Sequence, residues 1–393
     1  MSNDIEDNNF NLKIFPIPVI NNDIILNNDF DVELSTYTAQ PLFNLGFNHF
    51  IHQSYEIFEK MLEEQGNKTF FWVVNGFELK INDNDKQYEL LNNIKLYMEI
   101  DDIIDTTFIE IWEILMIYKL FNKNNKKIII NDIQNDNIKL ALNCYAKKNK
   151  FSCVFDTDKK YSKTKNNLLD LGIIYIDNPS SILEIESINF TQLIIQTVTI
   201  LKSIKNDGSL LIKLNDTFTL PSLKYIILLK SLFDQVSIYK PYYSRPTISD
   251  KYLVCTNLIE KSLNIISKKL DDMIENISEE INKNKFIIDI IPNIDIPKSL
   301  TIYLTYVNTL LSGIQHKEKN KILRYINSEN YFGQEFQEYV SNQLKCMEYF
   351  LSHFLPIDGN DSQIIQKEFM VNINNNIESL KRFKTFRTIS TKI

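Results

Sequence analysis

Between residues 94 and 258, short apolar runs alternate with longer segments whose apolar residues recur at helical spacing. Short runs rich in β-branched residues are typical of buried strands, and a spacing of three to four is typical of helices that bury one face. We predict strands at residues 94–100, 127–132, 151–155, 171–177, 208–214, 236–239 and 251–255, and helices at 108–121, 137–147, 190–203 and 220–233.

This alternation predicts an α/β fold with a mainly parallel sheet that helices cover on both faces, because each crossover is right-handed and helical. The loop between 236–239 and 251–255 is too short for a parallel crossover, so the last strand should be antiparallel. Ligands bind beyond the carboxyl ends of parallel strands. We expect these residues to gather at that edge: Asp101, Asp102, Asp132, Asp156, Asp158, Asp177 and Lys213.

Two further regions flank the predicted sheet. Residues 1–43 mix acidic, Asn-rich stretches with short apolar runs, which indicates an extended N-terminal arm. Residues 44–64 have helical spacing, and two β-rich runs around Asn75-Gly76 predict a hairpin over 69–81, since Asn-Gly favours a type I′ turn. From 259 onward the pattern is helical, at 259–283, 300–311 and 336–354. We therefore predict an arm (1–43), a sheet domain (44–258) and a helical C-terminal region with a basic tail (259–393), which packs on the sheet domain and offers a surface to a partner.

Composition restricts the partners and the compartment. A formal net charge of -7 argues against indiscriminate coating of nucleic acid, although it leaves room for a local basic groove. The four cysteines and four histidines form no zinc signature, so we predict no metal site. Without a signal peptide or a long apolar run, the sequence indicates a soluble protein of a reducing, cytoplasmic compartment with no membrane partner.

The stretch from 207 to 258 carries the most specific pattern. It reads G-S-L-L-I-K-L, an amphipathic helix, and then Y-K-P-Y-Y-S-R-P-T-I-S-D-K-Y-L-V-C. Arg245 is the first arginine of a chain that otherwise uses lysine until Arg324, and a guanidinium fork suits phosphate or carboxylate. This order resembles the FtsJ-like ribose 2′-O-methyltransferases, especially the mRNA-cap branch of eukaryotes and large DNA viruses. The resemblance covers residues 47–258 as a domain and 177–255 by motif.

The resemblance implies a class I methyltransferase fold, Rossmann-like, with a seven-stranded sheet. It also implies S-adenosylmethionine as cofactor and a Lys-Asp-Lys-Glu tetrad. In that tetrad the second lysine stabilises the alkoxide of a ribose 2′-hydroxyl, a poor nucleophile at neutral pH. Lys213 matches this lysine, Asp177 the aspartate, and Asp250 the glutamate, one methylene shorter. Gln53 stands near the position of the first lysine, which removes one charge.

The cofactor loop departs from the family pattern. Such enzymes place glycines after the first strand, because a glycine backbone lets the cofactor approach without a Cβ in the way. The corresponding stretch, 96–107, contains no glycine, and none occurs between Gly76 and Gly172. Carboxylates that could contact a cofactor in this region and at the following strand ends are Glu99, Asp101, Asp132 and Asp156.

Lys240, Ser244 and Arg245 are the candidate RNA-binding residues. An alternative is that this loop only braces the strand pair, with Arg245 bonded to loop carbonyls and Ser244 capping the turn. The tail 381–387 interleaves basic and aromatic residues, which can bind RNA or form a solvated terminus.

Two hypotheses follow. The first is a non-catalytic methyltransferase-fold subunit that supports mRNA capping or RNA modification, with capped mRNA or other RNA and a capping-enzyme subunit as partners, located in a viral factory or virion if the source is viral. In this case it needs no cofactor. The second is an active cap ribose 2′-O-methyltransferase that binds S-adenosylmethionine through an atypical loop.

Overall fold

The structure is a computed structural model that describes residues 12–21, 23–42, 45–66, 68, 70–77, 94–120, 126–130, 136–156, 169–176, 185–280, 285–328 and 333–355. Its strands are β1 (Lys13–Pro16), β2 (Val32–Ser35), β3 (Lys126–Ile130), β4 (Cys153–Asp156), β5 (Leu169–Ile174), β6 (Ile204–Leu214), β7 (Phe233–Lys240), β8 (Lys251–Leu258) and β9 (Phe286–Ile290). Its helices are α1 (Asp23–Leu26), α2 (Leu45–Gln65), α4 (Thr106–Tyr118), α5 (Asp136–Lys148), α6 (Ile185–Leu201), α7 (Leu220–Leu232), α8 (Glu260–Glu280), α9 (Lys298–Ser328), α10 (Gln334–Phe354) and the 3₁₀ helix η1 (Phe70–Val74).

The main sheet has the strand order β1-β7-β8-β6-β5-β3-β4. Strands β4, β3, β5 and β6 are parallel neighbours, whereas β8 is antiparallel to both β6 and β7. The α/β fold, and the antiparallel strand predicted at 251–255, are confirmed. From β3 the chain steps outward to β4 and returns to β5 on the other side of β3, so a topological switch point lies between β3 and β5.

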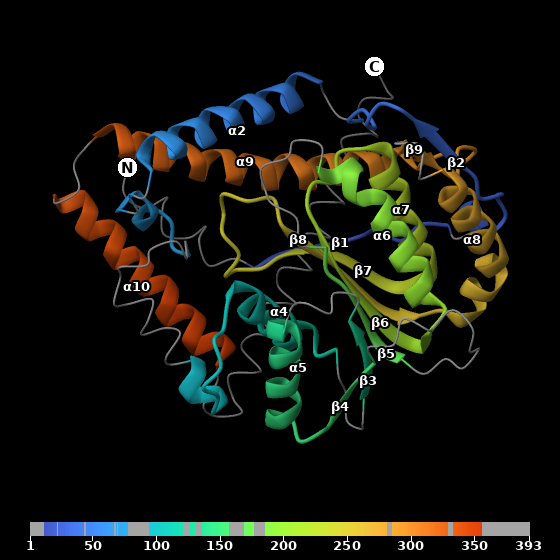
Figure 1. Ribbon diagram of the computed structural model, residues 1–393, viewed down its shortest axis with the longest axis horizontal. Helices are drawn as coiled ribbons and strands as arrows, with labels where there is room; N and C mark the ends of the chain where they lie inside the picture. The colour runs from blue at the N-terminus through green and yellow to red at the C-terminus, as the bar shows by residue number, and fades with distance from the viewer. Residues whose placement is uncertain are drawn as a thin grey trace, which may run out of the picture.

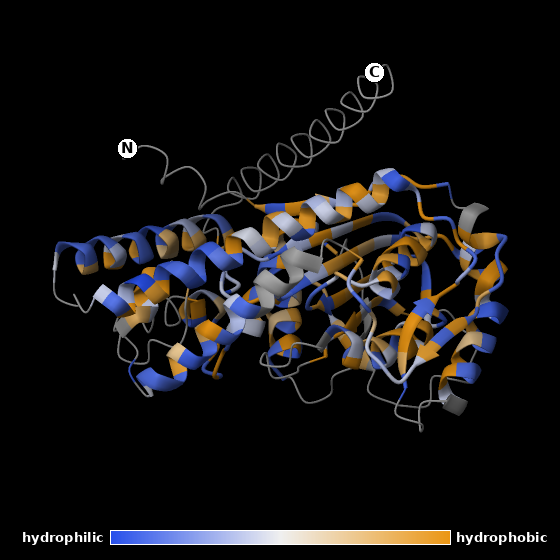
Figure 2. Cartoon of the chain, turned by 90° about the horizontal axis from the view of Figure 1, so that it is seen from above, coloured by the Kyte–Doolittle hydropathy of each residue, from blue (hydrophilic) through white to orange (hydrophobic). Residues whose placement is uncertain are grey.

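Helices cover the sheet on both faces (Figure 1). On one face α6, α7 and α8 bury a core that includes Ile212, Leu228 and Ile266, and on the other α4, α5 and α10 bury a second core. Alternate residues of β6 supply the two cores, with Ile212 in the first and Leu211 in the second, as the two-residue period of a strand requires. Figure 2 shows apolar residues concentrated on the strands and on the inner sides of these helices.

The predicted hairpin over 69–81 is wrong in its first half, because residues 70–74 form the 3₁₀ helix η1. Phe71, Trp72, Val73 and Val74 are all buried, in a cluster that includes residues of α2 and α9. A run that is buried among residues of α2, α9 and α10 gains nothing from β geometry. Residues 78–81 lie outside the described residues.

The strand predicted at 94–100 is also wrong, since residues 94–98 are helical. Ile94 and Met98 are buried while Leu96 between them is exposed. That spacing of four buries one side of a helical turn, and an apolar run this short does not distinguish helix from strand by its period.

The N-terminal arm contributes strands at two places. β1 pairs antiparallel with β7, with Ile14 in one core and Phe15 in the other. β2 pairs with β9, a strand inside the C-terminal region for which a purely helical pattern was expected. The prediction that this region packs on the sheet domain is supported by α8, α9 and β9 residues in the first core and by α10 residues in the second.

Candidate functional site

Lys213 and Asp250 form a salt bridge at the edge of the sheet, with 2.9 Å between Nζ and Oδ2. β6 and β8 are paired so that Lys213 lies opposite Tyr252, which brings the residue just before β8 alongside the end of β6. Asn215 donates to the other Asp250 oxygen at 2.9 Å. The shorter aspartate side chain therefore reaches the lysine, and both of its oxygens are engaged.

Tyr175, directly after β5, completes this cluster. Lys213 Nζ donates to the Tyr175 hydroxyl at 3.0 Å and lies 4.4 Å from the centroid of its ring. The same hydroxyl shares a hydrogen bond of 3.1 Å with Thr107 Oγ1 on the first turn of α4. The Lys213 side chain is only 8% exposed, so its ammonium is directed at protein groups.

The charges of this cluster hold both partners ionised. Burial alone would lower the pKa of Lys213, but the charges of Asp250, Tyr175 and Glu110 raise it above its ordinary value. Burial would raise the pKa of Asp250, yet Lys213 and Lys240 hold it below its ordinary value. An ammonium held in this way can stabilise negative charge that develops nearby, and it cannot act as a base at neutral pH.

The loop of residues 241–250, the 241–250 loop, is organised around Lys240. The Lys240 ammonium donates to Ser244 Oγ at 2.8 Å and to the carbonyl oxygens of Arg245, Ile248 and Asp250 at 3.2, 3.0 and 2.8 Å. Lys240 and Ser244 are buried, and Arg245 is half-buried. Lys240 and Ser244 thus hold the loop from inside, and the prediction that the loop binds RNA stays a prediction that depends chiefly on Arg245.

Helix α4 supplies two buried carboxylates to the same region. Glu110 accepts from the Tyr252 hydroxyl at 2.7 Å. Glu113 accepts from the backbone N–H groups of Tyr242 and Tyr243 at 2.5 and 3.1 Å, and from the Tyr239 hydroxyl. Burial raises the pKa of Glu110 above its ordinary value and that of Glu113 to about 7.

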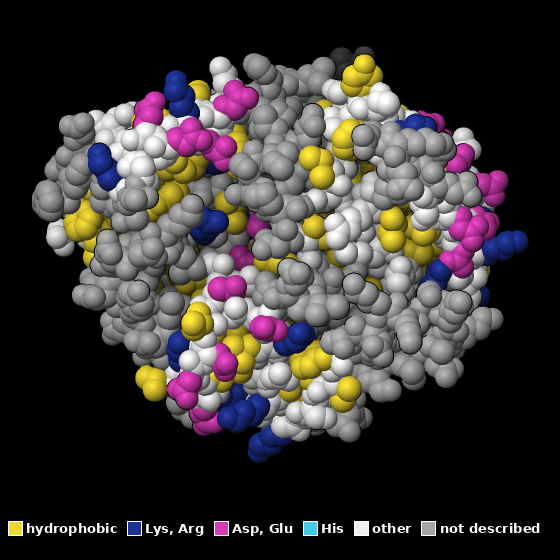
Figure 3. Space-filling view, viewed as in Figure 1, with side chains coloured by type: hydrophobic (Ala, Val, Ile, Leu, Met, Phe, Trp, Pro, Cys, Tyr) yellow, Lys and Arg dark blue, Asp and Glu magenta, His cyan; other side chains and the backbone are white. Residues whose placement is uncertain are grey.

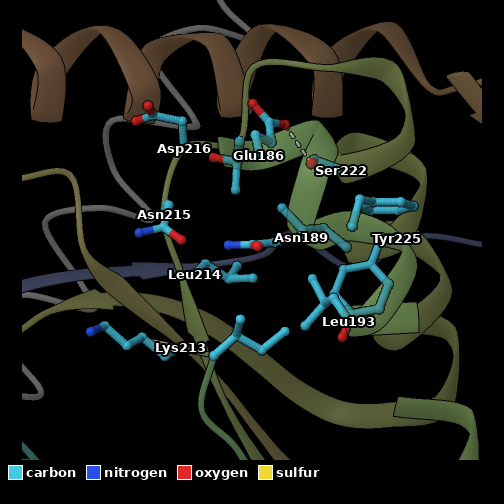
Figure 4. A pocket seen from close by; sticks show the side chains of 13 residues that line it. Glu186, Asn189, Leu193, Lys213, Leu214, Asn215, Asp216, Ser222 and Tyr225 are labelled. Carbon is cyan, nitrogen blue, oxygen red and sulfur yellow. Dashed lines mark hydrogen bonds between the residues drawn. The ribbon is translucent and has the colours of Figure 1, made fainter. Parts of the chain in front are cut away.

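A cavity of about 30 Å³ borders Lys213 but does not receive its ammonium (Figure 4). The cavity lies among residues of α6 and α7, and the Lys213 side chain points away from it. Glu186 lies at its rim and accepts from the N–H groups of Phe218 and Thr219, which cap α7. This volume has room for a few water molecules. A cavity of this size does not hold an adenosyl cofactor.

The other residues predicted for the site do not lie in the cluster around Lys213, or lie outside the described residues. Gln53 is exposed on α2. Glu99 is exposed and pairs with Lys147 of α5 at 2.7 Å, and Asp101 is exposed. Asp132 and Asp177 lie outside the described residues, and Asp156 ends β4. The structure thus brings together Lys213 and Asp250, with Lys240 at the end of β7 and Ser244 and Arg245 on the adjoining loop.

The order of the strands places the expected cofactor position after β3, and not after residues 94–98. Because residues 94–98 are helical, the segment that follows them leads into α4, where Asp105 caps the helix by accepting from Phe108 N at 3.0 Å. The switch point lies instead where β3 and β5 end. In sequence, the residues between β3 and α5 are Asn-Asp-Ile-Gln-Asn, with Asp132 among them and no glycine.

Tyr175, Glu110 and Glu113 were not predicted as site residues from the sequence. The signal for the two glutamates was their spacing of three within the otherwise apolar run T-T-F-I-E-I-W-E-I-L. A carboxylate in such a run is either exposed or paired when buried, and the sequence does not say which. Tyr175, within a predicted strand, carried no such signal.

Lys and Arg side chains are interspersed with Asp and Glu on the face in Figure 3. Among the described residues, no group of three or more His, Cys, Asp and Glu is placed to hold a metal ion. The same residues include no helix with the length and apolar character needed to cross a membrane.

Comparison with known proteins finds relatives over part of the chain. No protein-family model matches it. It is 25% identical over 244 residues to an uncharacterized protein of Acanthamoeba polyphaga mimivirus, covering 61% of this chain and 63% of that one. It is 28% identical over 144 residues to cap-specific mRNA (nucleoside-2′-O-)-methyltransferase 1 of Dictyostelium discoideum, covering 36% of this chain and 18% of that protein.

An inactive cap-specific mRNA (nucleoside-2′-O-)-methyltransferase 1B of Caenorhabditis briggsae is 24% identical over 148 residues, covering 37% of this chain and 17% of that protein. A solved structure of a putative ribosomal RNA methyltransferase of Plasmodium falciparum aligns with 36% of this chain and 91% of its own, at 16% identity and a TM-score of 0.27. The chain is thus a relative of the cap-specific mRNA 2′-O-methyltransferases over about a third of its length, and it spans less than a fifth of those it matches.

Proposed function

We propose that this protein is a non-catalytic member of the FtsJ-like cap methyltransferases, with a class I methyltransferase fold, that supports mRNA capping or RNA modification by holding RNA. The observation that carries the proposal is that the sequence between β3, which borders the switch point, and α5 contains no glycine. A bound adenosyl cofactor requires close backbone approach at such a position, and side chains with a Cβ obstruct it.

The cluster around Lys213 supports the same proposal. Its ammonium donates to Asp250 and Tyr175, and Asp250 accepts in turn from Asn215. A lysine that activates a substrate hydroxyl must present at least one donor to it. Here Asp250 and Tyr175 engage two of the three donors of an ammonium whose side chain is only 8% exposed, which suits a lysine that stabilises the edge of the sheet.

The RNA-holding part of the proposal is supported by the 241–250 loop. Its carbonyl oxygens are fixed from inside by Lys240, and Arg245 is less buried than Lys240 or Ser244. A preorganised loop loses little entropy when its guanidinium binds a phosphate. The relatives named for capping make capped mRNA the first RNA to test.

An active cap ribose 2′-O-methyltransferase is the second candidate. The specific observation in its favour is the Lys213–Asp250 bridge at 2.9 Å, in which two residues of the tetrad pattern lie together. In that case Lys213 would stabilise the alkoxide of the ribose, and S-adenosylmethionine would supply the methyl group.

Titration calorimetry with S-adenosylmethionine separates the two candidates. We expect no heat of binding up to millimolar cofactor, and binding of a short 5′-capped oligoribonucleotide by the same preparation shows that the protein is folded and competent. Micromolar affinity for the cofactor would overturn the non-catalytic proposal. Methyl transfer to capped RNA by the wild type, abolished in Lys213→Ala, would then establish the second candidate.

A further inference from the structure

Helix α4 carries one polar stripe on an otherwise apolar surface. Thr107, Glu110 and Glu113 recur at intervals of three, so they share one face of the helix, and all three are buried. Along this face, Thr107 bonds to Tyr175 beside Lys213, Glu110 bonds to Tyr252 of β8, and Glu113 bonds to the start of the 241–250 loop. The stripe therefore contacts both parts of the candidate site.

Of the three residues in this stripe, Glu113 accepts the most hydrogen bonds. Its carboxylate accepts from two successive backbone N–H groups, those of Tyr242 and Tyr243, and from the Tyr239 hydroxyl. Successive amides that converge on one anion form a nest, which fixes the backbone conformation of both residues. Lys240 fixes carbonyl oxygens farther along the same loop. An anion thus holds the amide end of the loop and a cation holds its carbonyl end.

We propose that Glu113 is a positioning residue for the 241–250 loop, and that it sets RNA affinity by fixing this loop without contacting RNA. The inference rests on the proposed function of the loop in holding RNA. The Tyr243 amide cannot find water if the carboxylate is lost, because Glu113 and Tyr243 are both fully buried and Tyr243 packs against Phe350 of α10.

The chemistry of the contact requires the ionised carboxylate. A glutamine offers one acceptor oxygen and turns an NH₂ group toward the other donors, so at least one amide loses its partner. A protonated glutamic acid has the same defect. Because burial raises the pKa of Glu113 to about 7, the loop should loosen as the pH falls through neutrality. The charged and titratable groups that face Glu113 are Glu110 of α4, Tyr239 of β7, Tyr242 of the loop and Lys13 of β1.

Glu113→Gln in the full chain tests the inference through two readouts. Hydrogen exchange of peptides that cover Tyr242 and Tyr243, without RNA, should lose protection. Affinity for a fluorescein-labelled, 5′-capped oligoribonucleotide at pH 8 should fall about tenfold. Glu110→Gln is the matched control for exchange, since it makes the same change on the same helix and bonds to Tyr252 instead. Glu63→Gln, exposed on α2, is the control for RNA affinity.

The pH profile separates positioning from a general loss of stability. Burial lowers the pKa of Lys240 to about 7, so its charge also changes between pH 8 and 6, in wild type and Glu113→Gln alike. The loss of affinity over this range that wild type shows and Glu113→Gln lacks is the component due to Glu113. If Glu113→Gln does not fold, Tyr239→Phe, which removes one donor to the same carboxylate, should shift the midpoint of the wild-type profile.

The outcomes distinguish this inference from the proposed function. RNA binding by the wild type that weakens in Arg245→Ala but not in Glu113→Gln, with unchanged exchange at Tyr242 and Tyr243, would overturn the inference alone. A wild type that binds no capped RNA would overturn both.

Discussion

At the scale of single residues, the Lys213–Asp250 bridge is a buried ion pair at the centre of the site. Both side chains are largely buried, at 8% and 17% exposure, and each is engaged by a second protein group. Removing one member of a buried pair leaves the other charge without compensation, which costs more than the intact pair contributes.

We therefore predict that Asp250→Asn lowers the free energy of unfolding by about 3 kcal/mol at pH 7, measured by urea denaturation. The depressed pKa of Asp250 means that its contribution is present above its ordinary value of 3.8 and lost as the pH falls below it. The raised pKa of Lys213 means that its contribution is present below 10.5 and lost as the pH rises further. Burial lowers the pKa of Lys240 to about 7 while the charge of Asp250 raises it, so the difference between variant and wild type should shrink as the pH rises through neutrality and Lys240 loses its proton.

Glu99→Gln is the control for this prediction, because the Glu99–Lys147 pair has a similar distance, 2.7 Å, but lies on the surface. It should leave the urea midpoint unchanged, since solvent screens exposed pairs. Equal effects of the two substitutions would show that the bridge to Lys213 does not stabilise the fold.

Motif resemblance identified Lys213, Asp250 and the 241–250 loop from the sequence, but it did not predict what holds them. The bridge depends on the register of β6 against β8, which the sequence did not specify at the level of one residue. Glu110, Glu113 and Tyr175 depend on α4 lying against the ends of these strands, a tertiary contact without a local signature.

At the scale of elements, helices and strands were predicted correctly where the length of a segment and the spacing of its apolar residues indicated the same structure. Helices α5, α6 and α7 and strands β3, β5 and β6 occur where alternation predicted them, within a few residues at their ends. It failed for η1, for residues 94–98 and for β1, β2 and β9. These are runs of four or five residues, in which the partner decides between strand and helix: β1 exists because β7 offers a free edge, and β9 because β2 lies beside it.

The packing of α6 on β5 gives a prediction at this scale. A Cβ added at Gly172 would lie 2.4 Å from Ile200 Cγ2 of α6 and 3.1 Å from Leu210 Cδ1 of β6. Gly172→Ala should therefore lower the free energy of unfolding by about 1–3 kcal/mol, measured by thermal and urea denaturation.

Gly313→Ala on α9 is the matched control, because an added Cβ there meets no atom within 4 Å. Alanine favours the helix, so this variant should be more stable than wild type by about 0.5–1 kcal/mol. Effects of the same sign would contradict the packing of α6 on β5 described above.

At the scale of the whole molecule, the C-terminal helices form part of the core around the site. Gln315 of α9 donates to the Thr247 carbonyl of the 241–250 loop at 3.0 Å, and Asn308 donates to the Thr217 carbonyl after β6 at 2.7 Å. The Trp112 indole N–H of α4 donates to the Phe354 carbonyl at the end of α10 at 2.7 Å. Removing α9 and α10 would expose the site and its core, so a partner surface on these helices is best tested with point substitutions.

Phe350 of α10 is the residue through which this arrangement can be tested. It is fully buried, with ring centroids 5.3 Å from Tyr243 and 4.9 Å from Phe354. Phe350→Ala should lower the free energy of unfolding by about 3–5 kcal/mol, because it removes a large buried side chain and leaves a cavity beside the loop. The same variant should raise hydrogen exchange at Tyr242 and Tyr243, since α10 covers them.

The matched control for Phe350→Ala is Glu348→Gln, an exposed position of the same helix. It should change neither stability nor exchange. A single unfolding transition, shifted as a whole by Phe350→Ala, is expected if the helices and the sheet share one core. Two transitions, with only the first shifted and the loop amides still protected, would mean that α10 folds apart from the sheet. Glu113, Lys240 and Gln315 would then hold the 241–250 loop without α10.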